Sequence, residues 1–181
     1  MISGNSINPS TGQIDAVSRV NMSSSGGGIS GYATPLSATP LPPPGTPGHS
    51  TNYDWANVVL QDGGWPLSTN NVTVITRWMD SEEPSSTWWN RNNPLNNGLG
   101  SGGGAGLGSY ADLLTAAHYV AANLYGGSSY GAIVADLAAS APPSTTAAAI
   151  WDSPWASSHY GFGASWHFGT VPTVAAPTSN W

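Results

Sequence analysis

Apolar residues recur every three or four positions in several stretches of the chain, which is the spacing of one face of an α-helix. The clearest stretch begins at Ser109 and ends before Gly126-Gly127. Asp112 stands three residues after Ser109, at a capping-box position, so we expect this helix to begin at Ser109. Its apolar stripe consists of Leu113, Leu114, Ala117, Val120, Ala121 and Leu124.

Four further helices are predicted from the same spacing and from the Gly and Pro residues that follow it. They cover residues 54–62, 68–83, 130–140 and 145–151. Residues 84–108 are predicted to form a loop, with a Gly-rich segment or a short β-hairpin. The sequence therefore predicts a mainly α fold, in which a small helical domain contains one core.

The two ends of the chain lack this periodicity. Residues 1–51 are rich in Pro, Gly and Ser, which is typical of an extended arm or linker. Two interpretations stay open for this segment: plain disorder, or an arm that becomes ordered against neighbouring subunits. The apolar residues that favour the second are Ile2, Ile7, Ile14, Val17 and Val20. We expect the domain to span residues 52–160 and residues 161–181 to form an aromatic, Gly-rich C-terminal tail.

Composition narrows the range of partners. Only 7% of the residues are charged, lysine is absent, and the net charge is −6. Such a chain is poorly suited to neutralising a run of phosphates, which disfavours nucleic acid and anionic membranes as partners. No apolar run approaches the ~20 residues of a membrane span, and the N-terminus shows no signal-peptide pattern. A neutral, hydroxyl-rich ligand suits this composition better.

Metal and cofactor chemistry is not indicated. The chain has no cysteine, and its histidines, His49, His118, His159 and His167, are scattered without metal-ligand spacing. No carboxylate cluster has the spacing of a calcium loop. We therefore expect no metal and no cofactor, so that activity should be insensitive to EDTA.

One carboxylate stands out in the second predicted helix. On a helical wheel Glu82 lies about 40° from Trp78 and about 60° from Met79, within the apolar stripe, whereas Glu83 lies at its edge. Burial disfavours the charged form, so the pKa of Glu82 should rise, as a general acid for glycosidic bonds requires. Alternatively, Glu82 merely emerges from the core where the helix ends, or pairs with an arginine such as Arg91.

Several short motifs lie before and after Glu82 along the chain. They are Trp55-Ala56-Asn57-Val58-Val59-Leu60, Gly64-Trp65-Pro66, Asn71-Val72, Arg77-Trp78-Met79-Asp80-Ser81-Glu82, Asn93-Pro94-Leu95-Asn96, Ser109-Tyr110-Ala111-Asp112, Tyr130, Ile133 and Ser153-Pro154-Trp155. In this order they resemble the lysozyme-like domain of actinobacterial phages and cell-wall proteins, which is related in fold to lytic transglycosylases and goose-type lysozymes. The most specific part is the Trp-x-x-x-Glu step followed by Asn-Pro-Leu-Asn.

The resemblance implies that Glu82 is the catalytic acid of a peptidoglycan hydrolase. Enzymes of this kind need one essential acid, and either water or the 6-hydroxyl of the substrate attacks the anomeric carbon. The chain departs from the family pattern after this residue, because Glu83-Pro84 replaces the usual Gly and Ser85-Ser86-Thr87-Trp88-Trp89 follows. The second carboxylate either raises the pKa of Glu82 further or marks a site that is drifting from catalysis.

Candidate substrate-binding residues follow the acid. Trp88 and Trp89 are candidates for stacking on sugar rings, with the alternative that one of them covers the core. Polar side chains nearby are candidates for binding hydroxyl or N-acetyl groups, although Asn-Pro-Leu-Asn is also a turn sequence. These polar candidates are Asn92, Asn93, Asn96 and Tyr110.

Three functions are consistent with these features. The first is a virion-associated peptidoglycan hydrolase that acts from a phage tail or tail tip on glycan strands of the host cell wall, with residues 1–51 contacting other virion subunits. The second is a non-catalytic tail or capsid protein that keeps the lysozyme-like fold, with or without glycan binding. A secreted or lysis-stage endolysin comes third, because no separate wall-binding module is seen.

Overall fold

The structure is a computed structural model of the 181-residue chain and describes residues 43–98, 108–156 and 159–181. All of these residues belong to one unit, Pro40–Trp181. Its described residues form α-helices and short 3-10 turns and contain no β-strand, so the predicted mainly α fold is confirmed. The predictions for residues 1–42 and for the Gly-rich segment 99–107 lie outside the described residues.

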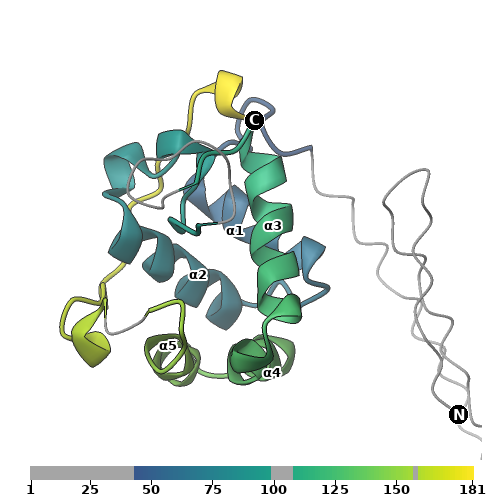
Figure 1. Ribbon diagram of the computed structural model, residues 1–181. Helices are drawn as coiled ribbons and strands as arrows, with labels where there is room; N and C mark the ends of the chain where they lie inside the picture. The colour runs from purple at the N-terminus through teal and green to yellow at the C-terminus, as the bar shows by residue number, and fades with distance from the viewer. Residues whose placement is uncertain (1–42, 99–107, 157–158) are drawn as a thin grey trace, which may run out of the picture. The chain divides into compact units, whose positions relative to one another are not determined.

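Five α-helices make up the described part of the fold (Figure 1). They are α1 (Asn52–Asp62), α2 (Thr69–Glu82), α3 (Leu113–Gly126), α4 (Gly131–Ala139) and α5 (Pro143–Trp151). The 3-10 turns are η1 (Ser85–Thr87), η2 (Asn90–Asn92), η4 (Ser128–Tyr130), η5 (Gly161–Gly163) and η6 (Thr178–Asn180). None of these described helices combines the length and hydrophobicity needed to cross a bilayer.

Side-chain caps set the starts of the helices. Thr51 and Asp54 form a capping box, which starts α1 at Asn52, two residues earlier than predicted. The Asp112 carboxylate accepts a hydrogen bond of 2.7 Å from the Thr115 amide, and α3 therefore begins one residue after it. The prediction that α3 begins at Ser109 is wrong, because Asp112 is itself the N-cap rather than the third residue of the helix.

The helices enclose one core rich in tryptophan. Helix α1 packs against α2 and α3, and α5 packs against α2 and α4. The buried Asn71 amide of α2 donates to the carbonyls of Pro66 at 2.9 Å and Leu137 at 2.8 Å, which ties α2 to α4. The largest fully buried side chains include Trp55, Leu60, Ile75, Trp78, Met79, Trp88, Leu95, Leu113, Leu124, Ile133, Leu137 and Tyr160.

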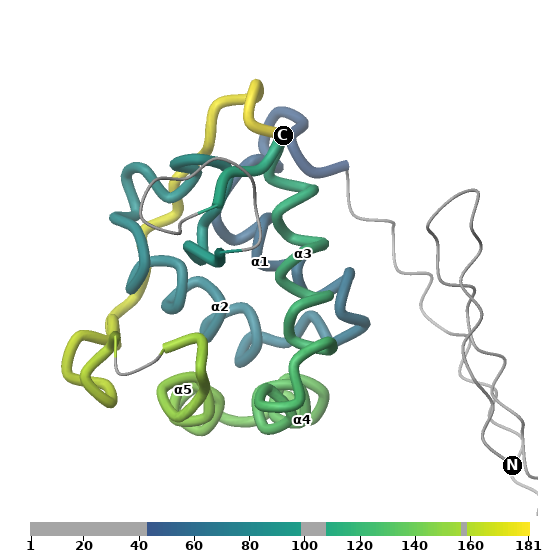
Figure 2. Tube along the Cα trace, in the orientation of Figure 1, coloured from purple at the N-terminus to yellow at the C-terminus, as the bar shows by residue number. Residues whose placement is uncertain are grey.

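The C-terminal segment is part of this folded unit. The Asn52 side chain donates to the carbonyl of Pro172 at 2.9 Å and accepts from the amide of Val174 at 3.0 Å. Residues 161–181 run from beside α5 past α2 (Figure 2), and Trp166 among them is buried. The predicted boundaries at residues 51 and 160 therefore differ from the structure, since residues 43–51 and 161–181 supply contacts that the helices need.

Candidate active site

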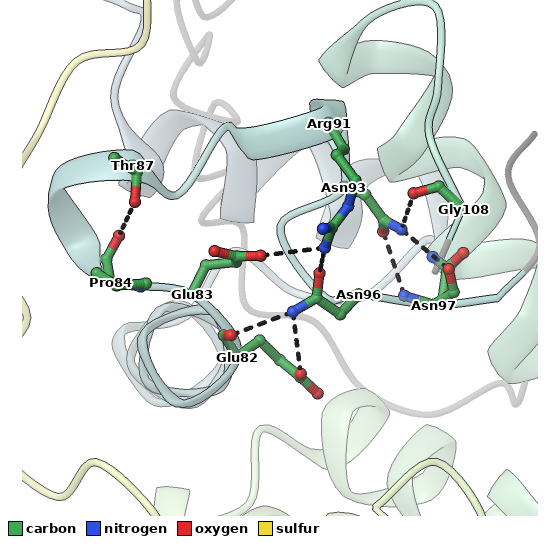
Figure 3. Close-up of polar contacts among 9 residues, drawn as sticks. All are labelled: Glu82, Glu83, Pro84, Thr87, Arg91, Asn93, Asn96, Asn97 and Gly108. Carbon is green, nitrogen blue, oxygen red and sulfur yellow. Dashed lines mark hydrogen bonds and ion pairs between the residues drawn. The ribbon is translucent and has the colours of Figure 1, made fainter. Parts of the chain in front are cut away.

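Glu82 is the last residue of α2. The helix stops there because Glu83 takes an extended conformation (φ −138°, ψ 142°) and Pro84 follows it. Glu82 and Glu83 consequently point in different directions from the end of the helix (Figure 3). Glu82 remains partly exposed at the end of the helix.

Two hydrogen-bond donors hold the Glu82 carboxyl group. The Tyr160 hydroxyl donates to Oε1 of Glu82 and accepts from Nε1 of Trp78 at 2.7 Å, so the three side chains form a continuous chain of hydrogen bonds. Nδ2 of Asn96 donates to the Glu82 backbone carbonyl at 3.1 Å and lies 3.4 Å from Oε2. Tyr160 is 1% exposed, so its hydroxyl is held in place by the core.

Burial dominates the electrostatics of Glu82. Loss of solvent raises the pKa of Glu82, while the hydrogen bond from Tyr160, the nearby His159 and the hydrogen bond from Asn96 act against this rise. The neighbouring Glu83 carboxylate adds a smaller contribution that also raises the pKa. The net shift is upward, so the direction predicted from the helical wheel is confirmed. Glu82 therefore keeps its proton to a higher pH than an exposed glutamate does.

Arg91 forms an ion pair with Glu83 and not with Glu82. Its Nη2 atom donates to Oε1 of Glu83 at 3.1 Å and also to Oδ1 of Asn96 (Figure 3). The Asn96 amide is thus held through its oxygen by Arg91 while its nitrogen faces Glu82. This arrangement fixes which end of the amide meets the carboxyl group. Asn96 is therefore a positioning residue, and the alternative of an Arg91–Glu82 ion pair is not realised.

Two of the predicted substrate-binding residues belong to the interior. Asn93 is fully buried, and its Nδ2 donates to the carbonyls of Asn97 at 2.9 Å and Gly108 at 2.8 Å, so it holds the turn and has no donor left for a ligand. Trp88 is 1% exposed and packs against Trp55 and other core aromatics. The assignment of Asn93 and Trp88 to a binding surface is corrected, because neither side chain reaches solvent.

The other predicted binding residues, Asn92, Asn96, Tyr110 and Trp89, are partly exposed. Nδ2 of Asn92 donates to the carbonyls of Tyr110 at 3.1 Å and Ala111 at 3.0 Å. The Tyr110 hydroxyl donates to Oδ1 of Asn97, and burial raises the pKa of Tyr110. Asn96 is thus the predicted polar residue that the fold brings to Glu82.

Two aromatic residues that were not among the candidate site residues pack beside Glu82 or its neighbour Trp78. Trp155, named above only as part of a motif, is partly exposed, its ring lies 4.8 Å from that of Trp78 at 66°, and its Nε1 donates to the Leu95 carbonyl at 3.2 Å. Tyr160 contacts Glu82 although the two residues are 78 positions apart. Tyr160 stands in the aperiodic stretch after α5, and the only signal for it was the density of aromatic residues there.

Two further carboxylates have structural partners. Oδ2 of Asp80 lies 2.8 Å from Nδ1 of His167, and Asp112 caps α3. Among the described residues, no three His, Asp or Glu side chains gather in a way that would hold a metal ion. The chemistry that Glu82 itself can offer is proton transfer by its carboxyl group.

Comparisons of the chain with protein-family models, with curated proteins and with solved structures give no match. The assignment of a function consequently depends on the geometry around Glu82, together with the motif order described above.

Replacing Tyr160 with phenylalanine should move the pH dependence of the site. The variant keeps the ring but removes a hydrogen bond that stabilises the Glu82 carboxylate, so the pKa of Glu82 should rise further. The measurement is an NMR titration of the Glu82 carboxyl carbon in the wild type and in the variant. An unchanged or lowered pKa would show that the Tyr160 hydroxyl does not stabilise the Glu82 carboxylate.

Proposed function

We propose that the protein cleaves the glycan strand of peptidoglycan with Glu82 as the single general acid. The observation that carries this proposal is the setting of Glu82: a partly exposed residue at the end of α2, with the pKa of its carboxyl group raised by burial and its oxygens contacted by Tyr160 and Asn96. A raised pKa is the shift that a general acid needs in order to protonate a glycosidic oxygen.

The residues support a simple sequence of proton transfers. Protonated Glu82 donates to the glycosidic oxygen, the bond from that oxygen to the anomeric carbon breaks, and the leaving sugar departs with a new hydroxyl group. Water or the substrate's own 6-hydroxyl then attacks the anomeric carbon, and its proton returns to Glu82. Between the two transfers, the Tyr160 hydroxyl and the Asn96 amide stabilise the carboxylate. Burial and the Glu82 carboxylate raise the pKa of Tyr160, so it remains a neutral donor throughout.

A non-catalytic, glycan-binding protein is the second candidate. The observation that favours it is that both oxygens of Glu82 already have partners within the chain. A substrate would have to replace one of these contacts before it received the proton. The hydrogen bond from Asn96 is the longer of the contacts at 3.4 Å, which makes Oε2 the oxygen more readily available to a substrate.

A place in a phage tail or tail tip is part of the proposal. It is supported by the resemblance to lysozyme-like domains of actinobacterial phages and by the composition of residues 1–51, whose sparse apolar residues suit contact with other virion subunits. The location would be tested by detecting the protein in purified particles by mass spectrometry.

The decisive assay for the activity uses the full chain and purified actinobacterial cell walls. If Glu82 acts as proposed, soluble glycan fragments should appear, and mass spectrometry should find either new reducing ends or 1,6-anhydro ends on them. Cell walls that bind the protein in a sedimentation assay but release no glycan would support the second candidate instead. Cell walls that neither bind it nor are cleaved by it would rule out both.

A further inference from the structure

An open pocket of about 400 Å³ lies in the region that follows α2. It is lined by Thr87, Trp89, Asn90, Arg91 and Asn180. Two of these residues, Thr87 and Trp89, come from the stretch where the sequence departs from the lysozyme-like pattern, and Asn180 comes from η6, far along the chain. The carboxyl group of Glu82 is not part of the lining, so the pocket is a second feature beside the acid.

Buried contacts behind the pocket hold its walls in place. Nδ2 of Asn180 donates to Oδ1 of Asn92 at 2.7 Å, which fixes η6 against η2. The core residue Trp88 packs edge-on against Trp89 at 5.9 Å and against Trp181 at 6.2 Å. Trp89 therefore presents a partly exposed indole that is supported from behind, and little order has to be created when a ligand binds.

The lining of the pocket is mainly neutral. Arg91 is the one charged residue in it, and Nη2 of this guanidinium donates to Glu83 and Asn96. The Glu83 carboxylate balances the charge of Arg91, and a cation would find no carboxylate in the lining. The other polar groups are the Thr87 hydroxyl and the side-chain amides of Asn90 and Asn180. Neutral donors and acceptors beside an indole match a ligand with hydroxyl and amide groups on a ring.

We propose that this pocket binds a neutral N-acetylated sugar unit of the glycan strand. Its volume falls within the range of small-molecule sites, about 300–1,000 Å³. Arg91 lines the pocket and also contacts Asn96, which contacts Glu82, so the pocket and the acid are separated by two side chains. The identity of the polymer rests on the proposed function, but binding of the sugar does not require cleavage.

The experiment measures binding without turnover. The tetramer of N-acetylglucosamine is titrated into the full chain carrying Glu82→Gln, and the affinity is measured by isothermal titration calorimetry. In this background Trp89→Ala should raise the Kd about tenfold, because the stacking surface is lost. Asn180→Ala should raise it several-fold, because it removes an amide of the lining and the contact of η6 with Asn92. Phe168→Ala, which removes an exposed aromatic residue outside the lining, is the matched control and should leave the Kd unchanged.

The outcomes separate this proposal from the proposed function. No binding of the tetramer at millimolar concentration, or a Kd that neither Trp89→Ala nor Asn180→Ala changes, would overturn the pocket assignment even if cell walls are cleaved. Binding that depends on Trp89 and Asn180 would support it even if the wild-type protein releases no glycan. A Kd that Phe168→Ala raises as much as Trp89→Ala would count against the pocket as the site.

Discussion

Replacing Glu82 with glutamine should reduce glycan release from purified cell walls by about 10²–10⁴-fold, the usual contribution of a general acid. The amide has nearly the same shape, and its oxygen can still accept from the Tyr160 hydroxyl, but it has no acidic proton to donate. Folding should not suffer, because a neutral side chain avoids the penalty of placing a charge in a partly buried position. Release of soluble glycan and circular dichroism are measured on the same preparations.

Glu83→Gln is the control for this substitution. Its amide oxygen can still accept the hydrogen bond from Arg91, so the orientation of Asn96 is largely preserved and glycan release should fall far less. Equal activity of the wild type and Glu82→Gln would show that Glu82 is not the acid. Equal losses in both variants would show instead that the carboxylates act through the structure of the turn.

Replacing Trp88 with alanine should lower the free energy of unfolding by about 3–5 kcal/mol, as expected for deleting a large buried aromatic side chain. The indole is 1% exposed, lies 6.4 Å from the ring of Trp55, and donates from Nε1 to the Val174 carbonyl at 2.9 Å. Its loss would leave a cavity and would remove one of the two hydrogen bonds that the Val174 carbonyl accepts, the other coming from the Asn52 amide at 3.1 Å. Chemical denaturation followed by circular dichroism gives the difference from wild type.

Phe168→Ala provides a comparison for Trp88→Ala, because its side chain is 57% exposed and its removal should change stability by no more than about 0.5 kcal/mol. Small domains are often stable by only about 5–15 kcal/mol, so the loss in Trp88→Ala is large enough to prevent folding in a marginally stable domain. Trp88→Phe retains an aromatic ring and is the milder substitution to measure in that case. A Trp88→Ala variant as stable as the wild type would show that Trp88 does not stabilise the core, and Trp88 would again be a candidate for ligand binding.

Helix α2 and the place of Glu82 on its buried face could be predicted from the sequence because both depend on the spacing of nearby residues. An apolar stripe of helical period places Glu82 on the buried face, and the residues after it stop the helix. The same reasoning found all five helices to within a few residues. The predicted start of α3 was wrong because Asp112 can be the N-cap itself or can stand three residues after an N-cap at Ser109. Both possibilities leave the same apolar stripe on the helix.

Tyr160 could not be found in this way. It contacts Glu82 across 78 positions, and residues 161–181, which follow it, form two 3-10 turns and irregular segments whose contacts follow no period. The tryptophan pair shows a related limit: both residues are aromatic neighbours in a polar loop, yet Trp88 enters the core and Trp89 remains partly exposed. Which of two adjacent side chains is buried depends on the backbone direction of a short 3-10 turn, which composition does not encode.

The position of Arg91 between the pocket and Asn96 makes proton binding and ligand binding interdependent. A ligand that draws the guanidinium away from Asn96 would loosen the amide that stabilises the Glu82 carboxylate, and Glu82 would then hold its proton more tightly. Thermodynamic reciprocity requires that the same ligand bind more tightly to the protonated protein, by an equal factor. Uptake of protons from the buffer on ligand binding, measured with wild-type protein in buffers of different ionisation enthalpy, would report this coupling.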